Sequence, residues 1–234
     1  MTKKGLAQVW GGYRDVLKPQ WWYDWSPVPD DPTKVPMLRS GLPNVSLPVD
    51  YSDYVLVFNE PNVHEPNGCW VPDYMEGIAR YAVLAHVYPQ AQFIVGSVSA
   101  WSYSWLVRFH KMAIRCKLRL PLGYAIHGYA GDYGTLATMF GWWQKAHDQI
   151  KAITPGLEFW ITETGDMKGR PTVLKAIWAK ALALDADRAG FYTDRQPDAP
   201  WAISKGVEMI NDSGLTPIGE AFVELDGGRD DNVV

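Results

Sequence analysis

From residue 54 onward, the chain alternates short apolar runs with longer stretches of helical periodicity. The apolar runs predict parallel strands, because strands covered on both faces read as continuous apolar segments. Five runs are clear: Tyr54–Phe58, Gln92–Val98, Gly123–His127, Glu158–Thr162 and Ala189–Thr193. Each of the first four is followed by apolar residues at helical spacing, which predicts repeated strand–helix units.

The predicted helices have recognisable starts and stops. Pro72-Asp73 opens the first helix, Ser102 can cap the second, and Pro171 stands where a first-turn proline is favoured in the fourth. The third helix has the clearest periodicity, over Leu136–Ile153, and Thr154-Pro155-Gly156 stops it.

The first third of the chain has a weaker pattern. Leu6–Trp10, Trp21–Trp25 and Val35–Leu38 are plausible strands, but the segments between them are rich in proline and lack helical periodicity. They bring the count to eight strands, and repeated strand–helix units form a parallel sheet through right-handed crossovers. We therefore expect one α/β domain over residues 1–234, a (β/α)8 TIM barrel with an irregular, helix-poor first third and a frayed tail at 227–234. A doubly wound open sheet is the alternative, but its G-x-G-x-x-G turn is missing.

Composition and charge argue against nucleic-acid and membrane partners. The 234 residues are 47% apolar and 21% charged, and the formal net charge of -4 gives no basic stripe for nucleic acid. No apolar run approaches the roughly 18 residues that a membrane span needs. The N-terminus does not read as a signal peptide, so we expect an intracellular protein or a secreted one whose leader has been removed. Cys69 and Cys116 are expected to be free thiols, although one bridge stays possible.

The chain is rich in aromatic residues, with twelve tryptophans and twelve tyrosines. Tryptophan offers a flat apolar face and one N–H donor, which suits a ligand with apolar faces and a polar rim, such as a sugar ring. Most individual tryptophans, Trp143 and Trp178 among them, are better explained as core residues. The excess therefore favours a carbohydrate ligand without requiring one.

Two glutamates follow predicted strands directly. Glu60 comes after the fourth strand and Glu163 after the seventh, and the active site of such a barrel lies at these strand ends. Glycosidic cleavage needs two carboxyl groups, one to protonate the leaving oxygen and one to stabilise the oxocarbenium-like centre; in retaining enzymes they lie about 5–5.5 Å apart. Glu65 follows no apolar run, so we expect it to be a loop charge. Asp166 and Arg39 fit a surface ion pair as well as a substrate contact.

Several segments resemble a known family. VFNEP and WITETG look like the paired motifs of clan A of the retaining glycoside hydrolases, in which the fourth strand presents Asn-Glu and the seventh the nucleophilic Glu. In chain order, WWYDWSP, VPMLRSG, LVFNEPN, AIHGY and FWITETGD resemble glycoside hydrolase family 128, whose members cleave β-1,3-glucans. The resemblance runs from Trp21 to the terminal LTPIGEAF, which looks like the closing helix of the clan.

The resemblance implies a function and roles for individual residues. Glu60 matches the acid/base and Glu163 the nucleophile of a double displacement, which implies an endo-β-1,3-glucanase acting on β-glucan oligosaccharide or polysaccharide. Asn59 would hydrogen-bond the substrate 2-hydroxyl, and Tyr129 would hold the Glu163 carboxylate. The other expected substrate-binding residues are Trp22, Asp24, Trp25, His127 and Trp201. We expect a monomer that needs no cofactor and no metal.

Departures from the family pattern affect the predicted substrate more than the predicted reaction, and other functions stay open. Asp24 stands where family members usually have asparagine, Arg39 stands near a usual tryptophan, and HGY replaces a His-aromatic-Tyr sequence. His127 also fits a structural hydrogen bond at the barrel mouth. A non-catalytic carbohydrate-binding barrel and a clan A glycosidase for another β-linked polysaccharide stay open. A metal-dependent hydrolase is disfavoured, because the five histidines have no His-x-His or H-E-x-x-H spacing.

Overall fold

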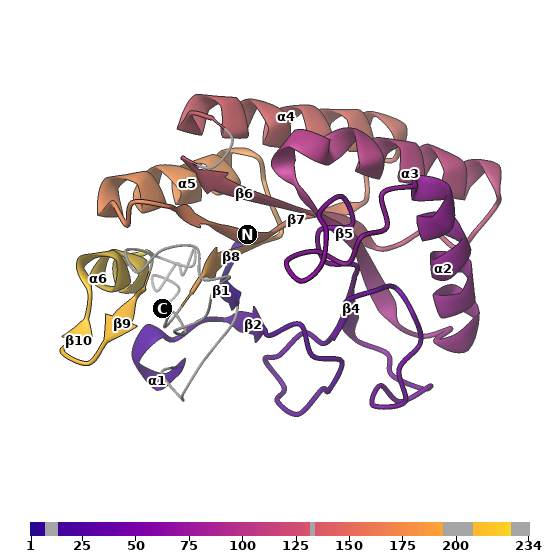
Figure 1. The fold of residues 1–234 in the computed structure, drawn as a ribbon, viewed down its shortest axis with the longest axis horizontal. Coiled ribbons are helices and arrows are strands. Elements are labelled where there is room, and N and C mark those ends of the chain that lie inside the picture. The colour runs from indigo at the N-terminus through magenta and orange to yellow at the C-terminus, as the bar shows by residue number, and fades with distance from the viewer. Residues whose placement is uncertain (8–13, 132–133, 194–207, 226–234) are drawn as a thin grey trace, which may run out of the picture.

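The computed structural model describes residues 1–7, 14–131, 134–193 and 208–225, and its centre is a parallel sheet of eight strands. Their order is β2-β1-β8-β7-β6-β5-β4-β3. Consecutive strands are therefore neighbours in the sheet except β2 and β3, which lie at its two edges, and β1 also pairs with β8 (Figure 1). The strands are β1 Lys3–Ala7, β2 Trp21–Tyr23, β3 Met37–Leu38, β4 Tyr54–Val57, β5 Gln92–Ser99, β6 Gly123–Ala130, β7 Glu158–Asp166 and β8 Arg188–Tyr192. This order curls the sheet into a nearly closed barrel, which confirms the predicted (β/α)8 architecture.

Helices follow four consecutive strands and cover the outside of the barrel (Figure 1). They are α2 Tyr74–Val87, α3 Tyr103–Arg115, α4 Leu136–Ile153 and α5 Pro171–Ala183, each where apolar periodicity predicts it. Asp73 caps α2 through its side chain, whereas Ser102 makes no capping bond, because the 3₁₀ turn η1 Ala100–Ser102 leads directly into α3.

Short elements complete the described chain. A single turn, α1 Arg14–Leu17, is a helix that the sequence pattern does not predict. Residues 24–53, all of them described, contain no helix, which confirms the helix-poor first third. The hairpin of β9 Ile210–Asn211 and β10 Gly214–Leu215 leads into α6 Pro217–Glu224, the expected closing helix. The predicted frayed tail at 227–234 lies outside the described residues.

The join between β2 and β3 explains why the barrel is only nearly closed. Lys34 forms an isolated parallel bridge with Trp22, and Val35 N donates to Trp22 O at 2.8 Å. Two residues later, Met37 pairs with β4 instead. The predicted strand Val35–Leu38 therefore divides its pairing between two neighbours, at Pro36, which has no N–H to donate to a sheet.

Apolar side chains fill the barrel interior. All eight strands and Val35 contribute to this inner cluster: Ala7, Trp21, Tyr23, Val35, Met37, Leu56, Ile94, Ala125, Trp160 and Tyr192. The Arg188 guanidinium lies over the rings of Trp21, Tyr54 and Trp160 where the strands begin. A larger apolar layer between strands and helices includes Trp143 and Trp178, as predicted. The barrel is thus a packed core, and the opposite ends of the strands are left for polar side chains.

Two sequence-level expectations concern cysteines and membranes. Cys69 is buried and Cys116 exposed, and both are free thiols, as expected. Among the helices of the described ranges, none combines the length and the apolar character of a membrane span.

Candidate active site

Glu60 is presented by a strained backbone just beyond β4. Phe58 and Glu60 have φ values of 69° and 45°, in the left-handed region that non-glycine residues rarely adopt. Glu60 N donates to Ser97 O of β5 at 3.0 Å, and Asn59 N donates to Arg39 O beyond β3 at 3.0 Å. The segment is thus fixed to strands on both sides, and local strain of this kind is typical of functional sites.

Glu163 reaches the barrel mouth through an irregularity in β7. Trp160 points into the barrel and Ile161 away from it, so strict alternation would turn Glu163 outward. The register of β7 shifts against both neighbouring strands at this point, and the shift pairs Glu163 with His127 of β6. Such a bulge re-aims a side chain. The predicted strand Glu158–Thr162 therefore ends too early, because β7 continues to Asp166 and Glu163 lies within it.

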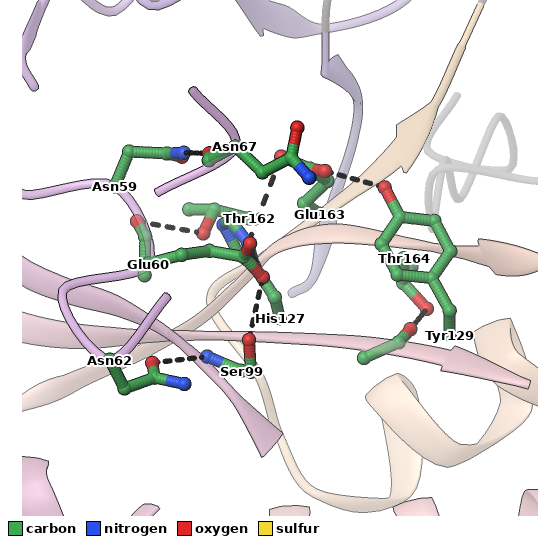
Figure 2. Close-up of polar contacts among 12 residues, drawn as sticks. Asn59, Glu60, Asn62, Asn67, Ser99, His127, Tyr129, Thr162, Glu163 and Thr164 are labelled. Carbon is green, nitrogen blue, oxygen red and sulfur yellow. Dashed lines mark hydrogen bonds and ion pairs between the residues drawn. The ribbon is translucent and has the colours of Figure 1, made fainter. Parts of the chain in front are cut away.

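The two glutamates meet at one atom of His127. Its Nδ1 lies 3.3 Å from Glu60 Oε1 and 3.7 Å from Glu163 Oε2 (Figure 2). His127 is only 1% exposed, so this contact lies in the floor of the barrel mouth. The structure therefore brings together the two carboxylates that the sequence singles out, with one imidazole nitrogen between them.

Two phenols hold the Glu163 carboxylate. Tyr23 Oη donates to Oε2 at 3.0 Å, and Tyr129 Oη donates to Oε1 at 2.5 Å, the contact that the resemblance implies for Tyr129. Burial and the charge of Glu163 raise the pKa of both phenols well above the ordinary value, so both remain protonated donors. Burial also raises the pKa of Glu163, and Glu60 adds to this effect, while His127 and the two phenols oppose it.

Both hydrogen bonds to the Glu60 carboxylate are made to the same oxygen, Oε1. Ser99 Oγ donates to Oε1 at 2.8 Å, and His127 approaches the same atom. Ser99 is itself held by Asn62, whose Oδ1 accepts from Ser99 N at 3.2 Å (Figure 2). Among the described residues, Oε2 of Glu60 accepts no hydrogen bond. This oxygen is therefore available to carry a proton to a ligand.

His127 is buried at the centre of this arrangement. Burial alone would lower the pKa of His127, but the carboxylates of Glu163 and Glu60 outweigh it and raise that pKa above its ordinary value. Its second nitrogen, Nε2, is buried and has no hydrogen-bond partner among the described residues. A buried polar atom without a hydrogen bond is costly.

Asn59 and Trp25 lie together at the edge of the site. Trp25 Nε1 donates to Asn59 Oδ1 at 3.0 Å, and Asn59 Nδ2 donates to Asn67 O at 3.0 Å. A primary amide has two N–H groups, and only one of those of Asn59 donates to another of the described residues, which leaves the second for a ligand. The Trp25 ring stands edge-on to Tyr23 with centroids 5.9 Å apart, next to the carboxylates.

Two other expected substrate-binding residues, Trp22 and Asp24, contact charged side chains of the chain, and a third lies outside the described residues. Trp22 lies on the opposite face of β2 from Tyr23, between the Arg14 guanidinium and the Lys34 ammonium, because side chains alternate along a strand. Asp24 forms an ion pair with Lys34 at 3.0 Å. Trp201 lies outside the described residues.

The remaining charged candidates form ion pairs within the chain, though not with each other. Arg39 pairs with the exposed Glu65 at 3.0 Å, which confirms that Glu65 is a loop charge. Asp166 is fully buried, and although burial opposes it, the hydrogen bonds of Arg170 lower the pKa of Asp166. Within the described ranges, no three or more His, Cys, Asp or Glu side chains are grouped to hold a metal ion.

Sequence reasoning gives no role to two residues of this site, Tyr23 and Ser99, although both stand at predicted strand ends. Tyr23 has a usable signal, because the alternation that places Trp21 inside the barrel also places Tyr23 there. Ser99 lies at the end of β5, beyond a register shift between Val95 and Val98. That shift has no signature in the apolar pattern.

The nearly closed barrel, with two glutamates facing each other at its mouth, is the architecture of a glycoside hydrolase barrel. The family model described as glycosyl hydrolase catalytic core matches residues 6–176. The chain belongs to this family. No curated protein sequence matches the chain.

Solved structures of glycoside hydrolase family 128 share the fold. A subgroup I endo-β-1,3-glucanase from Amycolatopsis mediterranei in complex with laminaritriose is 17% identical, with a TM-score of 0.68 over 95% of this chain and 99% of that one. A subgroup III curdlan-specific exo-β-1,3-glucanase from Blastomyces gilchristii is 20% identical, with a TM-score of 0.69 over 95% and 98%. A subgroup VII oligosaccharide-binding protein from Trichoderma gamsii is 17% identical, with a TM-score of 0.62 over 94% and 92%.

Proposed function

We propose that the protein is a retaining glycoside hydrolase that cleaves internal bonds of β-1,3-glucan by double displacement. The observation that carries this proposal is the contact of one imidazole nitrogen with both Glu60 and Glu163 at the barrel mouth. The likeness to an endo-β-1,3-glucanase with bound laminaritriose supports the substrate class. The likeness to an oligosaccharide-binding protein supplies the alternative, a barrel that binds glucan without cleaving it.

In the first step, Glu163 attacks the anomeric carbon and Glu60 protonates the departing oxygen. Tyr23 and Tyr129 fix the attacking carboxylate, which would otherwise be free to rotate. Glu60 presents Oε2 to the glycosidic oxygen, because Oε1 is held by Ser99 and His127. The glycosidic bond breaks, the leaving sugar takes the proton from Glu60, and the glycosyl group becomes an ester of Glu163.

In the second step, the ionised Glu60 removes a proton from water as that water attacks the anomeric carbon. The ester bond breaks and Glu163 leaves as a carboxylate, with net retention of configuration. In this proposal the second N–H of Asn59 binds the 2-hydroxyl of the reacting sugar, and Trp25 contacts its ring. No step uses a cofactor.

The proposal is tested by a reducing-sugar assay across β-1,3-, β-1,4- and mixed-linkage glucans, with Glu163→Gln as the blank. We expect release from β-1,3-glucan by the wild type, no release by Glu163→Gln, and glucan binding by both proteins. Binding without release by the wild type would establish the binding-only alternative. Release from another glucan alone would establish a clan A glycosidase of different linkage.

A second variant tests the role of Glu60 in the same experiment. Glu60→Gln should lose about 10²–10⁴-fold in kcat on glucan, because general acid catalysis typically contributes that much. Its turnover of an aryl glycoside with a good leaving group should fall far less, because such a group departs without a proton. Equal loss on both substrates would contradict the assignment of Glu60 as the acid.

A further inference from the structure

A pair of buried hydroxyl groups joins the two strands on either side of β6. Ser97 Oγ of β5 lies 3.1 Å from Thr162 Oγ1 of β7, and both side chains are fully buried. Strands two apart in a sheet are separated by roughly 10 Å, so short side chains of β5 and β7 meet only on the concave inner face of the barrel. Neither hydroxyl has another hydrogen-bond partner among the described residues.

Both hydroxyls belong to irregularities in their strands. The register of β5 against β6 shifts between Val95 and Val98, and Ser97 lies within this shift with a φ of 46°. On β7, Thr162 is the extra residue of the bulge just before Glu163. The extra residue of a bulge is left out of the ladder of backbone hydrogen bonds. The hydroxyl pair therefore links the two places where the sheet departs from regular pairing.

Each of these irregularities is attached to one of the two glutamates. Glu60 N donates to Ser97 O at 3.0 Å, so the backbone that presents the proposed acid is held by the β5 irregularity. Thr162 immediately precedes Glu163 in the chain, so the β7 bulge carries the proposed nucleophile. The hydroxyl pair therefore completes a continuous connection between the two glutamates: a backbone hydrogen bond, a hydroxyl–hydroxyl bond and one peptide bond.

The separation of the two carboxyl groups decides what such a site can do. Retaining glycosidases hold them about 5–5.5 Å apart, and inverting enzymes about 6.5–9.5 Å apart. Because this difference is small, a displacement of about 1 Å would take a reacting group out of its working position. His127 contacts both carboxylates, but it belongs to β6 and does not by itself fix β5 against β7.

We propose that the hydrogen bond between Ser97 and Thr162 sets the separation of the two glutamates, and that these two residues are positioning residues for the proposed reaction. They act through Glu60 and Glu163 and do not touch a substrate, because neither side chain is exposed. This inference rests on the proposed function and deepens it, because it names the contact that holds acid and nucleophile at a fixed distance.

The test removes each hydroxyl and compares kcat with KM on laminarihexaose. Ser97→Ala and Thr162→Val should each lower kcat about tenfold or more, because misplacement of a reacting group by about 1 Å can cost about 10²-fold. KM should change less than about twofold, because no exposed side chain is altered. The double variant should lose no more than either single variant, because the bond is already broken. Thr162→Ser keeps the hydroxyl and should retain kcat within about twofold.

Tyr124→Phe is the matched control, because it removes one hydroxyl from another buried side-chain pair. Tyr124 Oη lies 2.9 Å from His110 Nδ1, and Tyr124 belongs to the layer between strands and helices. Urea denaturation should show a loss of stability in Tyr124→Phe of the same order as in Ser97→Ala. Its kcat should nevertheless match that of the wild type, because this pair is attached to neither glutamate.

Each outcome separates the positioning role from the underlying reaction. Wild-type kcat in Ser97→Ala and Thr162→Val, or an equal loss in Tyr124→Phe, overturns the positioning role while the proposed function stands. Losses that add in the double variant, or a Thr162→Ser loss as large as that of Thr162→Val, overturn it too, because the hydroxyl bond is then not the cause. A wild type that releases no sugar from any glucan overturns the proposed function, and this inference with it. Near-UV circular dichroism establishes folding, and Ser97→Ala with Thr162→Ser decides the test should Thr162→Val not fold.

Discussion

At the scale of single residues, His127 lowers the pKa of Glu163. Its imidazolium opposes the effects of burial and of Glu60, both of which raise the pKa of Glu163. In His127→Gln this opposition is lost, so the pKa of Glu163 should rise further. Because the nucleophile must be ionised, the acid limb of kcat/KM should move to higher pH, which a pH–rate profile on β-laminaribiosyl fluoride would measure.

The control for this prediction is a histidine that pairs with a carboxylate elsewhere. His147 on α4 contacts the exposed Asp148 at 2.9 Å, so His147→Gln replaces a histidine beside a carboxylate without touching the site. Its acid limb should match that of the wild type. An acid limb of His127→Gln that stays in place or moves to lower pH would disprove the electrostatic role.

The sequence identifies the reacting groups better than their supports. Glu60 and Glu163 are recognisable because a carboxylate next to a buried run is costly unless it is used or paired. Aromatic content alone does not distinguish Trp22 from Tyr23, whereas the alternation along β2 places Tyr23 inside the barrel and Trp22 on its outer face. The position of Ser99 beside Glu60 depends on the register shift between β5 and β6, and that shift depends on contacts between the strands.

At the scale of elements, Arg39 fixes the loop between β4 and α2. Its Nη1 lies 3.0 Å from both carboxylate oxygens of Glu65, and its Nη2 donates to Pro66 O at 2.6 Å and Gly68 O at 2.7 Å. The same loop supplies the carbonyl that holds the Asn59 amide. This single side chain therefore stabilises the loop that orients a proposed substrate-binding residue.

We expect Arg39→Gln to raise KM for laminarihexaose several-fold with a smaller change in kcat, because binding is disturbed more than the carboxylates. Glu65→Gln should change KM little, since it removes only an exposed ion pair, worth about 0–1 kcal/mol, and leaves the two carbonyl contacts in place. Steady-state kinetics of both variants would measure the split. Equal effects of the two substitutions would mean that the ion pair, and not the carbonyl contacts, holds the loop.

Element boundaries were predictable only where apolar residues mark them. The helices after β4 to β7 lie where periodicity places them, but β6 and β7 extend beyond their apolar runs to Ala130 and Asp166. Those extensions form because neighbouring strands pair with them, and the length of an apolar run does not predict that pairing. The short α1 is stabilised by its surroundings, since one turn is too short to be stable alone.

At the scale of the whole molecule, two glycines make room for the tryptophan that fills the barrel. Gly5 of β1 and Gly190 of β8 are paired in register. A Cβ on Gly5 would lie 2.3 Å from the Trp21 indole, and one on Gly190 would lie 2.7 Å from Thr162 O and 3.0 Å from that indole. Barrel packing therefore depends on the absence of side chains at these two positions.

Gly5→Ala and Gly190→Ala should each lower the free energy of unfolding by about 1–3 kcal/mol, the usual cost of overpacking a core. Gly141→Ala is the control, because a Cβ there meets no atom within 4 Å and alanine favours the helix, which should raise that free energy by about 0.5–1 kcal/mol. Urea denaturation would measure all three. Unchanged stability in both strand variants would show that the interior repacks freely.

The barrel as a whole was predictable because repeated strand–helix units leave few topologies open. What the sequence could not supply is how the first third closes it. That depends on Lys34 and Val35 pairing with β2 while Met37 pairs with β4, and proline-rich segments without periodicity give no sign of such sharing.

The strand β6 contacts both carboxylates, since His127 touches each of them and Tyr129 holds Glu163. A shift of this one strand would therefore disturb proton donor and attacking group at the same moment. The positions of the proton donor and the attacking group are therefore coupled. A substitution in a residue packed against β6 that improves one step should be tested for its effect on the other.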